Sequence, residues 1–353
     1  MRHAGQGRRL RAAAASATKA LALYHDLGDR AGQANTLNNL GMVQRWTGDH
    51  GAAAASCGQA LKLFRELGHR YGQGDALNEL SVIQGLTGDY AAAAESLQQA
   101  LALYRDIGHR LGQATALVNL GIVQGLTGDY QAAAASQRQA LQQFRDLGDR
   151  SGQAHARDEL GHLQQLTGDY PAAAASHQRA LDMFRDLGDL PGQAYALNGL
   201  GVVQQETGDY PAATASHRQA LALFRDLGNR LGQAEALNRL GELATRTANT
   251  GQAREHHARA LAISHDLSAP LEEARALEGL GQAHLQDSNP GQAAAHLRQA
   301  LAIYQRIGAP AAQRVQQTLQ DHKLASTPKP QPAAPPTVQA ISPHTPAWPP
   351  PSR

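Results

Sequence analysis

The chain has 353 residues, of which 42% are hydrophobic, and a formal net charge of +2. So small a charge excludes a general polyanion binder, and the only dense basic cluster, at Arg8, Arg9 and Arg11, gives little reason to expect direct contact with nucleic acid. No segment has the about 18 consecutive apolar residues that a membrane-spanning helix needs, and the start of the chain lacks the apolar core of a signal peptide. We therefore expect a cytoplasmic protein that makes no membrane contact.

The sequence is one short unit copied many times. A Thr-Gly-Asp triplet returns at Gly48, Gly88, Gly128, Gly168 and Gly208, and a Leu-Gly pair returns in register from Leu40-Gly41 to Leu280-Gly281, with Ser81 in place of one glycine. A fixed period of this length is the signature of a repeat array. Such arrays grow by adding units and build extended surfaces, so the length of the chain says nothing about the number of domains.

The array is predicted to begin in the middle of a repeat. Residues 1–9 are expected to be a flexible N-terminus, and residues from about 10 to 27 read as the second helix of an incomplete repeat. The buried face of that helix would have no partner, which would expose Leu21 and Leu23 unless another segment covers them. This indicates either that the chain is the trailing part of a longer protein or that arrays associate with each other through the unpaired first helix.

Each full unit predicts two helices. From residue 33 to 46, Leu37, Leu40 and Gly41 fall on one side of a helix, and Gly48 offers a left-handed cap that ends it. A second helix follows from about 50 to 67, with small and apolar residues on its buried side. Pro171 and Pro211 fit this division, because each lies in the first turn of a second helix, where a missing backbone N–H costs little.

Seven such pairs reach about residue 307, and residues 311–324 suit a capping helix, so the solenoid should cover residues 10–324. In repeats six and seven the triplet degenerates to Ala248-Asn249-Thr250 and Ser288-Asn289-Pro290, as expected of terminal units. Residues 325–353 are rich in proline, alanine, threonine and serine, a composition that predicts a disordered tail. The fold class predicted is all-α, a right-handed α-solenoid of antiparallel helix pairs.

The pattern resembles the tetratricopeptide repeat family. The small residues of that family match Gly121, Ala133 and Ala140, its turn matches Gly128-Asp129-Tyr130, and the match covers nearly the whole solenoid. Two departures are present: a glutamine (Gln44, Gln84, Gln124, Gln164, Gln204) stands where the family usually has an aromatic residue, and the unit is about six residues longer than the usual 34. The longer unit is similar to that of kinesin light chains and spindle-orientation scaffolds, and bacterial signalling proteins carry such arrays behind ATPase or DNA-binding domains.

The resemblance implies a ligand groove along the concave face, lined by one stripe of each first helix. On a helical wheel the framework positions repeat almost unchanged, whereas the stripe varies from apolar in the early repeats to polar and of mixed charge in the later ones. We expect the protein or peptide ligand to contact residues of this stripe: Asn38, Met42, Trp46, Asn78, Val82, Leu86, Ile122, Leu126, Asp158, His162, Asn198, Asn238 and Glu242.

Asparagine recurs at one position of this stripe, at Asn38, Asn78, Asn198 and Asn238. An amide donates and accepts at once, so a ladder of amides could hold the backbone of an extended peptide, as related arrays do. Alternatively, each amide bonds to the neighbouring repeat and tightens the superhelix. The sequence leaves both possibilities open.

Catalytic interpretations have weaker support. His155, Asp158 and His162 have helical spacing that could place them on one face as metal ligands. A polar lining of the groove explains these residue types as well. Other histidines lie at repeat positions that we expect to be solvated, such as His177, His217 and His257. Cys57, the single cysteine, reads as a small buried side chain. No phosphate-binding loop or nucleophile motif is present. We expect no enzyme activity, cofactor or metal.

Three functions follow from the sequence. The first is a scaffold or adaptor that binds a protein or peptide in its concave groove without catalysis. The second is the C-terminal sensor of a larger bacterial signal-transduction ATPase or transcriptional regulator, which the half-repeat start would suit. The third, a metal enzyme using His155, Asp158 and His162, is the least supported.

Overall fold

The computed structural model describes residues 3–324, with side chains from residue 12 onward. This part of the chain is built of sixteen helices without a strand. The helices are α1 (His3–Asp26), α2 (Arg30–Thr47), α3 (His50–Glu66), α4 (Arg70–Thr87), α5 (Tyr90–Asp106), α6 (Arg110–Leu126), α7 (Tyr130–Leu147), α8 (Arg150–Leu166), α9 (Tyr170–Leu187), α10 (Leu190–Glu206), α11 (Tyr210–Asp226), α12 (Arg230–Arg246), α13 (Thr250–Asp266), α14 (Pro270–Gln286), α15 (Pro290–Arg306) and α16 (Ala311–Asp321).

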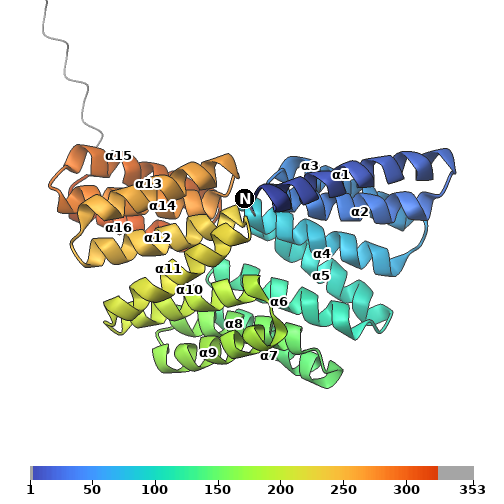
Figure 1. Ribbon diagram of the computed structural model, residues 1–353, viewed down its shortest axis with the longest axis horizontal. Coiled ribbons are helices and arrows are strands. Elements are labelled where there is room, and N and C mark those ends of the chain that lie inside the picture. The colour runs from blue at the N-terminus through green and yellow to red at the C-terminus, as the bar shows by residue number, and fades with distance from the viewer. Residues whose placement is uncertain (1–2, 325–353) are drawn as a thin grey trace, which may run out of the picture.

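Consecutive helices pack as pairs, α2 with α3 through α14 with α15, and each pair packs on the next (Figure 1). The predicted fold class, an all-α right-handed solenoid of antiparallel helix pairs, is confirmed. Helix α1 precedes the seven pairs but begins at His3, so residues 3–9 are helical where we expected a flexible segment. The predicted disordered tail, residues 325–353, lies outside the described residues.

The helix boundaries arise from local capping. The Asp49 side chain accepts a hydrogen bond from the backbone N–H of Ala52 at the start of α3, and the same aspartate position caps most second helices. Gly48 ends α2 with φ of 86°, in the left-handed region that a side chain disfavours. Pro171 lies in the first turn of α9, as predicted.

Close approach within a pair depends on the glycine of the Leu-Gly motif. A Cβ on Gly121 would lie 2.6 Å from Nε2 of Gln137, and one on Gly161 would lie 2.9 Å from the ring of His177. The glycine therefore makes room for whatever side chain the second helix places opposite it. In repeat one that side chain is Cys57, which is buried, and burial raises its pKa to about 12. Cys57 has a packing role, as the sequence indicated.

The expectation that His177, His217 and His257 are solvated is wrong. All three occupy the position opposite the Leu-Gly glycine and are buried. Their ring Nδ1 atoms contact Asp158 at 2.6 Å, Asn198 at 2.8 Å and Asn238 at 3.2 Å. The prediction assumed that a polar histidine would lie in solvent. A polar partner on the facing first helix allows the ring to be buried instead.

The glutamine that replaces the family's aromatic residue makes a hydrogen bond within its own pair. The Ser56 hydroxyl donates to Oε1 of Gln44 at 2.7 Å, and Ser136 donates to Gln124 at 2.8 Å. The same pairing recurs in repeats two, four and five. A buried polar pair thus takes the place of an aromatic contact in fixing the spacing of the two helices.

The solenoid curls until its two ends touch. In Figure 1 the early repeats (blue) and the late repeats (orange) meet at the top, above the middle repeats (green), and α14 contacts α4 directly. The turn glycines Gly48 and Gly88 lie against Leu267 and Ile307, and Pro310 lies against Gly128. The sequence separation is 219 residues both between Gly48 and Leu267 and between Gly88 and Ile307, so about five and a half repeats complete one superhelical turn. We call this contact the seam.

The seam accounts for the altered junctions that follow repeats six and seven. Leu267 and Ile307 are only 9% and 4% exposed, whereas the matching Leu147 and Leu187 are about 40% and 41% exposed. After these residues, Ala269 stands where other repeats have a capping Asp, His or Asn, and the N-terminus of α14 has no side-chain cap. A capping aspartate at this buried position would be desolvated. The junctions at Leu267 and Ile307 are therefore adapted to the closure, whereas the altered triplets at 248–250 and 288–290 lie at other turns.

Candidate functional site

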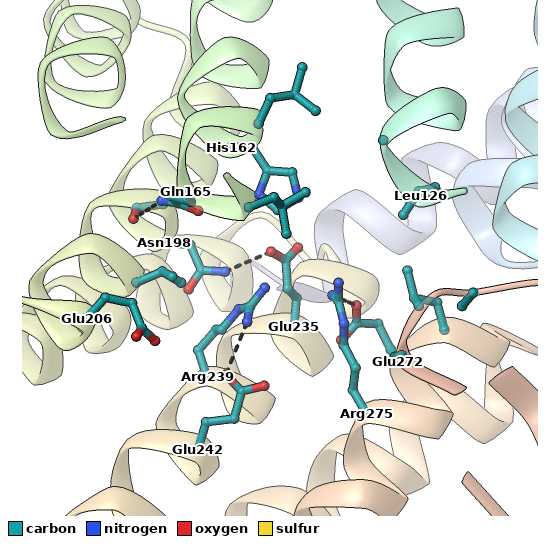
Figure 2. A pocket seen from close by; sticks show the side chains of 18 of the residues that line it. Leu126, His162, Gln165, Asn198, Glu206, Glu235, Arg239, Glu242, Glu272 and Arg275 are labelled. Atoms are coloured by element: carbon teal, nitrogen blue, oxygen red, sulfur yellow. Dashed lines mark hydrogen bonds and ion pairs between the residues drawn. The ribbon is translucent and has the colours of Figure 1, made fainter. Parts of the chain in front are cut away.

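The closed superhelix encloses a cavity of about 920 Å³ along its concave face. Residues of the first helices line it, from α6 through α8, α10, α12 and α14, together with Arg314 of α16. Figure 2 shows a pocket in which side chains from these helices, among them His162, Glu235 and Arg239, surround an open space. The wheel-based prediction that one stripe of the first helices faces the concave side agrees with this arrangement.

The predicted groove residues fall into three groups. Six line the large cavity: Ile122, Leu126, Asp158, His162, Asn198 and Glu242. Val82 and Leu86 line a smaller cavity of about 330 Å³, which they share with Ile122 and Leu126. Five line neither cavity: Asn38, Met42, Trp46, Asn78 and Asn238.

Three of the four asparagines, Asn78, Asn198 and Asn238, are engaged within the array, whereas Oδ1 of Asn38 is buried without a hydrogen-bond partner. Asn198 is buried and donates to Glu235 of the next repeat at 3.0 Å, and Asn238 is buried and donates to Glu272 at 2.9 Å. Oδ1 of Asn78 accepts from Asn119 at 3.0 Å. These bonds between neighbouring repeats match the second of the two roles considered for the asparagine ladder. Asn198 and Asn238 therefore cannot offer both the N–H and the C=O of the side-chain amide to a ligand without losing bonds that hold the repeats together.

Met42 and Trp46 lie on α2 at the other end of the array and are exposed. The Arg45 guanidinium lies 5.3 Å from the ring centroid of Trp46 and is paired with Glu79 of the next repeat. This cation–π contact stabilises the indole on the surface. The aromatic side chain is thus held away from the two cavities.

One part of the cavity wall carries matched charges. Arg239 donates to Glu242 at 3.1 Å, Arg275 to Glu272 at 2.5 Å, and Arg314 to Glu278 at 2.9 Å. Burial alone would raise the pKa of Glu242, but Arg239 and Arg275 outweigh it and lower that pKa. Glu242 is therefore ionised, and each of the three carboxyl groups has a guanidinium as its partner.

Another part carries carboxylates without a matched cation. Burial, followed by the charges of Asp158 and Glu235, raises the pKa of Glu159 to about 8. Burial and then Glu272 raise the pKa of Glu235, which accepts a hydrogen bond from the amide of Asn198. Tyr195 lies in the same region, and burial followed by Glu235 raises its pKa to about 12. Burial and neighbouring carboxylates thus disfavour negative charge on Glu159 and Glu235.

The histidines considered as metal ligands turn to different partners. His155 lies 3.4 Å from Asp189, whereas Asp158 contacts His177. His162 faces the cavity, and burial followed by Arg239 and Arg275 lowers its pKa to about 3, so it is neutral. Within residues 3–324 no group of three His, Cys, Asp or Glu side chains is arranged to hold a metal ion. In the same range no helix has the length and apolar character to cross a membrane.

Several cavity residues were missed by the sequence prediction. Glu159 and Arg239 occupy the repeat position next to the asparagine ladder, just outside the stripe defined on the helical wheel. A stripe one position wider would have included them. Glu272 stands where other repeats have a glycine that packs on the preceding aromatic ring, and Ser264 replaces that ring. This double departure from the framework was the signal that could have identified Glu272.

A solenoid of stacked antiparallel helix pairs with a cavity on its concave face is an α-helical repeat protein. The sequence model of the tetratricopeptide repeat matches residues 32–106, 112–186, 152–226, 192–266 and 232–306. The chain belongs to the tetratricopeptide repeat family. No curated protein sequence matches it.

Solved structures share the fold at low sequence identity. A Rap protein complexed with competence and sporulation factor is 13% identical, with a TM-score of 0.66 over 86% of this chain and 87% of that one. The Rap conjugation gene regulator of plasmid pLS20, in complex with the Phr* peptide, is 14% identical, with a TM-score of 0.67 over 84% and 78%. A signal-transduction ATPase with a tetratricopeptide repeat sensor from Pyrococcus horikoshii is 14% identical, with a TM-score of 0.50 over 82% of this chain and 44% of that one.

Proposed function

We propose that the protein binds a peptide, or a peptide segment of another protein, inside the cavity enclosed by its superhelix and does not catalyse a reaction. The observation that carries this proposal is the cavity of about 920 Å³, which runs along the concave face and is lined by side chains that vary from repeat to repeat. Varied side chains on a rigid frame preorganise a binding surface, so that association orders the ligand more than the receptor. As part of the same proposal we expect binding to take place in the cytoplasm.

The likeness to two Rap structures supports a peptide as the ligand. Both match most of this chain, and both are complexes with a named factor or peptide. At such low sequence identity the likeness shows only a shared fold. The chemistry of the ligand therefore has to be inferred from the side chains of this chain.

Blocking the cavity tests the proposal. Val202 lines the cavity from α10, and a Val202→Arg variant would place a long side chain across it. Gln178→Arg on the exposed side of α9 adds the same side chain outside the cavity. Both variants and the parent chain are incubated with the peptide fraction of a bacterial lysate, and retained peptides are identified by mass spectrometry. We expect the parent and Gln178→Arg to retain the same peptides and Val202→Arg to lose them; equal retention by all three would contradict the proposal.

A second candidate function is a sensor within a larger regulator. The likeness to the tetratricopeptide repeat sensor of the Pyrococcus signal-transduction ATPase favours it, since this chain covers 44% of that protein. The test is the DNA upstream of the coding region: an in-frame nucleotide-binding or helix-turn-helix segment would support this function. The sensor role and peptide binding are compatible, because the sensing event would be the occupation of the same cavity.

A further inference from the structure

Closure of the superhelix places the early groove opposite the late groove. The smaller cavity, about 330 Å³, has α4 and α6 on one side and the N-terminal parts of α10, α12 and α14 on the other. It shares Ile122, Leu126, Tyr195 and Glu235 with the large cavity, so the two adjoin each other. A ligand at this junction would touch repeats two and three and repeats five to seven at once.

The two sides of the junction differ in chemistry. Val82, Leu86, Ile122 and Leu126 form an aliphatic wall on α4 and α6. These side chains are half-buried, so apolar surface is available to a ligand and its burial would favour binding. We call this the apolar wall.

The opposite side provides carboxyl groups that have no cation as a hydrogen-bond or ion-pair partner. Glu235 accepts one hydrogen bond, from Asn198 at 3.0 Å, and Glu159 has no hydrogen bond or ion pair among the described residues. The nearby guanidinium groups are already engaged: Arg239 donates to Glu242 and Arg275 to Glu272. Desolvated carboxylates of this kind gain from a cation brought by a ligand. We call Glu159 and Glu235 the acidic wall.

From this geometry we infer that the ligand is an extended peptide segment in which aliphatic and basic side chains alternate. In an extended chain successive side chains point to opposite sides, so aliphatic residues would contact the apolar wall while the basic residues between them reach Glu235 and Glu159. An α-helix is about 10–12 Å across, and about two of its turns would fill the larger cavity, which favours an extended ligand. The inference rests on the proposed function and specifies its ligand.

General charge attraction would not produce this preference. The chain as a whole has a net charge of +2, which repels a basic peptide weakly. At physiological ionic strength interactions beyond about 8 Å are largely screened. A preference for basic peptides would therefore arise from direct contact with the carboxyl groups of the acidic wall.

Three acetylated, fluorescently labelled pentapeptide amides test the inference by fluorescence anisotropy at physiological ionic strength. The first alternates, Leu-Lys-Leu-Lys-Leu; the second has glutamate in place of lysine; the third has the first peptide's composition in blocks, Leu-Leu-Leu-Lys-Lys. We expect the first to bind at least tenfold more tightly than the other two. Glu235→Gln and Leu126→Asn should each reduce its affinity severalfold, whereas Glu255→Gln, on an exposed face of α13, should not change it.

The outcomes separate this inference from the proposed function. Equal or tighter binding of the glutamate or block peptide would overturn the inference and leave peptide binding standing. The same holds if none of the three binds although the parent chain retains lysate peptides that Val202→Arg loses. If neither the pentapeptides nor lysate peptides bind, both proposals are wrong. Thermal unfolding of Glu235→Gln and Leu126→Asn, compared with the parent chain, identifies any variant that has lost its fold, and the remaining variant then decides.

Discussion

His217 and His257 are fully enclosed between the two helices of their repeats, and their Nε2 atoms have no hydrogen-bond partner. Burial followed by the charge of Arg239 lowers the pKa of His217 to about 3, and burial lowers that of His257 to about 4. In the unfolded chain both pKa values return to about 6.5. Between pH 6.5 and 4 the unfolded state therefore binds protons that the folded state excludes, and stability falls as the pH falls.

The leucines found at this position in repeats two and seven supply a matched replacement. We expect the parent chain to lose about 2 kcal/mol per histidine between pH 7.5 and 5.0, and His217→Leu/His257→Leu to lose correspondingly less over the same range. Urea unfolding at the two pH values measures the difference. An equal pH-dependent loss in both proteins would show that these histidines are not the groups responsible.

Single residues also mark the limit of what the sequence revealed about the site. The position of Asn198 and Asn238 on the concave stripe followed from the helical wheel, but their role depended on Glu235 and Glu272 in the next repeat. Helical periodicity places a side chain on a face and does not identify what stands opposite it. Burial of the three histidines was not predicted for the same reason, because their hydrogen-bond partners lie on another helix.

At the scale of the helices, local sequence signals were sufficient to predict where most helices begin and end. Capping aspartates, left-handed turn glycines and prolines in first turns act within one or two turns of chain, so the division into helix pairs could be predicted from the sequence. Helices α14 and α16 are exceptions, since no side chain caps their N-termini, and α14 follows Ala269. The reason is the seam, which buries this residue.

A pair of substitutions at equivalent positions tests this explanation. The Asp149 side chain accepts from the backbone N–H of Gly152 at the start of α8. We expect Asp149→Ala to lower the free energy of unfolding by about 1 kcal/mol. Ala269→Asp introduces the usual cap yet should also destabilise, because the carboxylate would be desolvated in the seam. Urea unfolding measures both, and stabilisation by Ala269→Asp would mean that this junction is open in solution.

At the scale of the whole molecule, the closure could not be predicted from the sequence. The path of a solenoid accumulates from small rotations between neighbouring repeats, and each repeat contacts only its neighbours until a full turn is complete. The apolar and polar stretches of the groove were both identified, but nothing in the sequence indicated that they face each other. The two cavities owe their shape to that long-range contact.

Charging the seam should open the molecule. We expect Leu267→Asp/Ile307→Asp to increase the radius of gyration measured by small-angle X-ray scattering, since two carboxylates would be buried against Gly48 and Gly88. Leu147→Asp/Leu187→Asp changes the same repeat position where it is exposed and should leave the scattering unchanged. An unchanged radius for both variants would contradict a seam that holds the ends together.

The constant separation across the seam has a consequence for how such a protein can evolve. If one 40-residue unit were duplicated in the middle of the array, Leu267 and Ile307 would move on by one whole repeat and meet the next turn glycines along, so closure would survive. The residues that face each other across the interior would change, however, and the apolar side chains of repeats two and three would lose their present counterparts. Gene duplication could thus exchange one ligand preference for another while the fold remains intact.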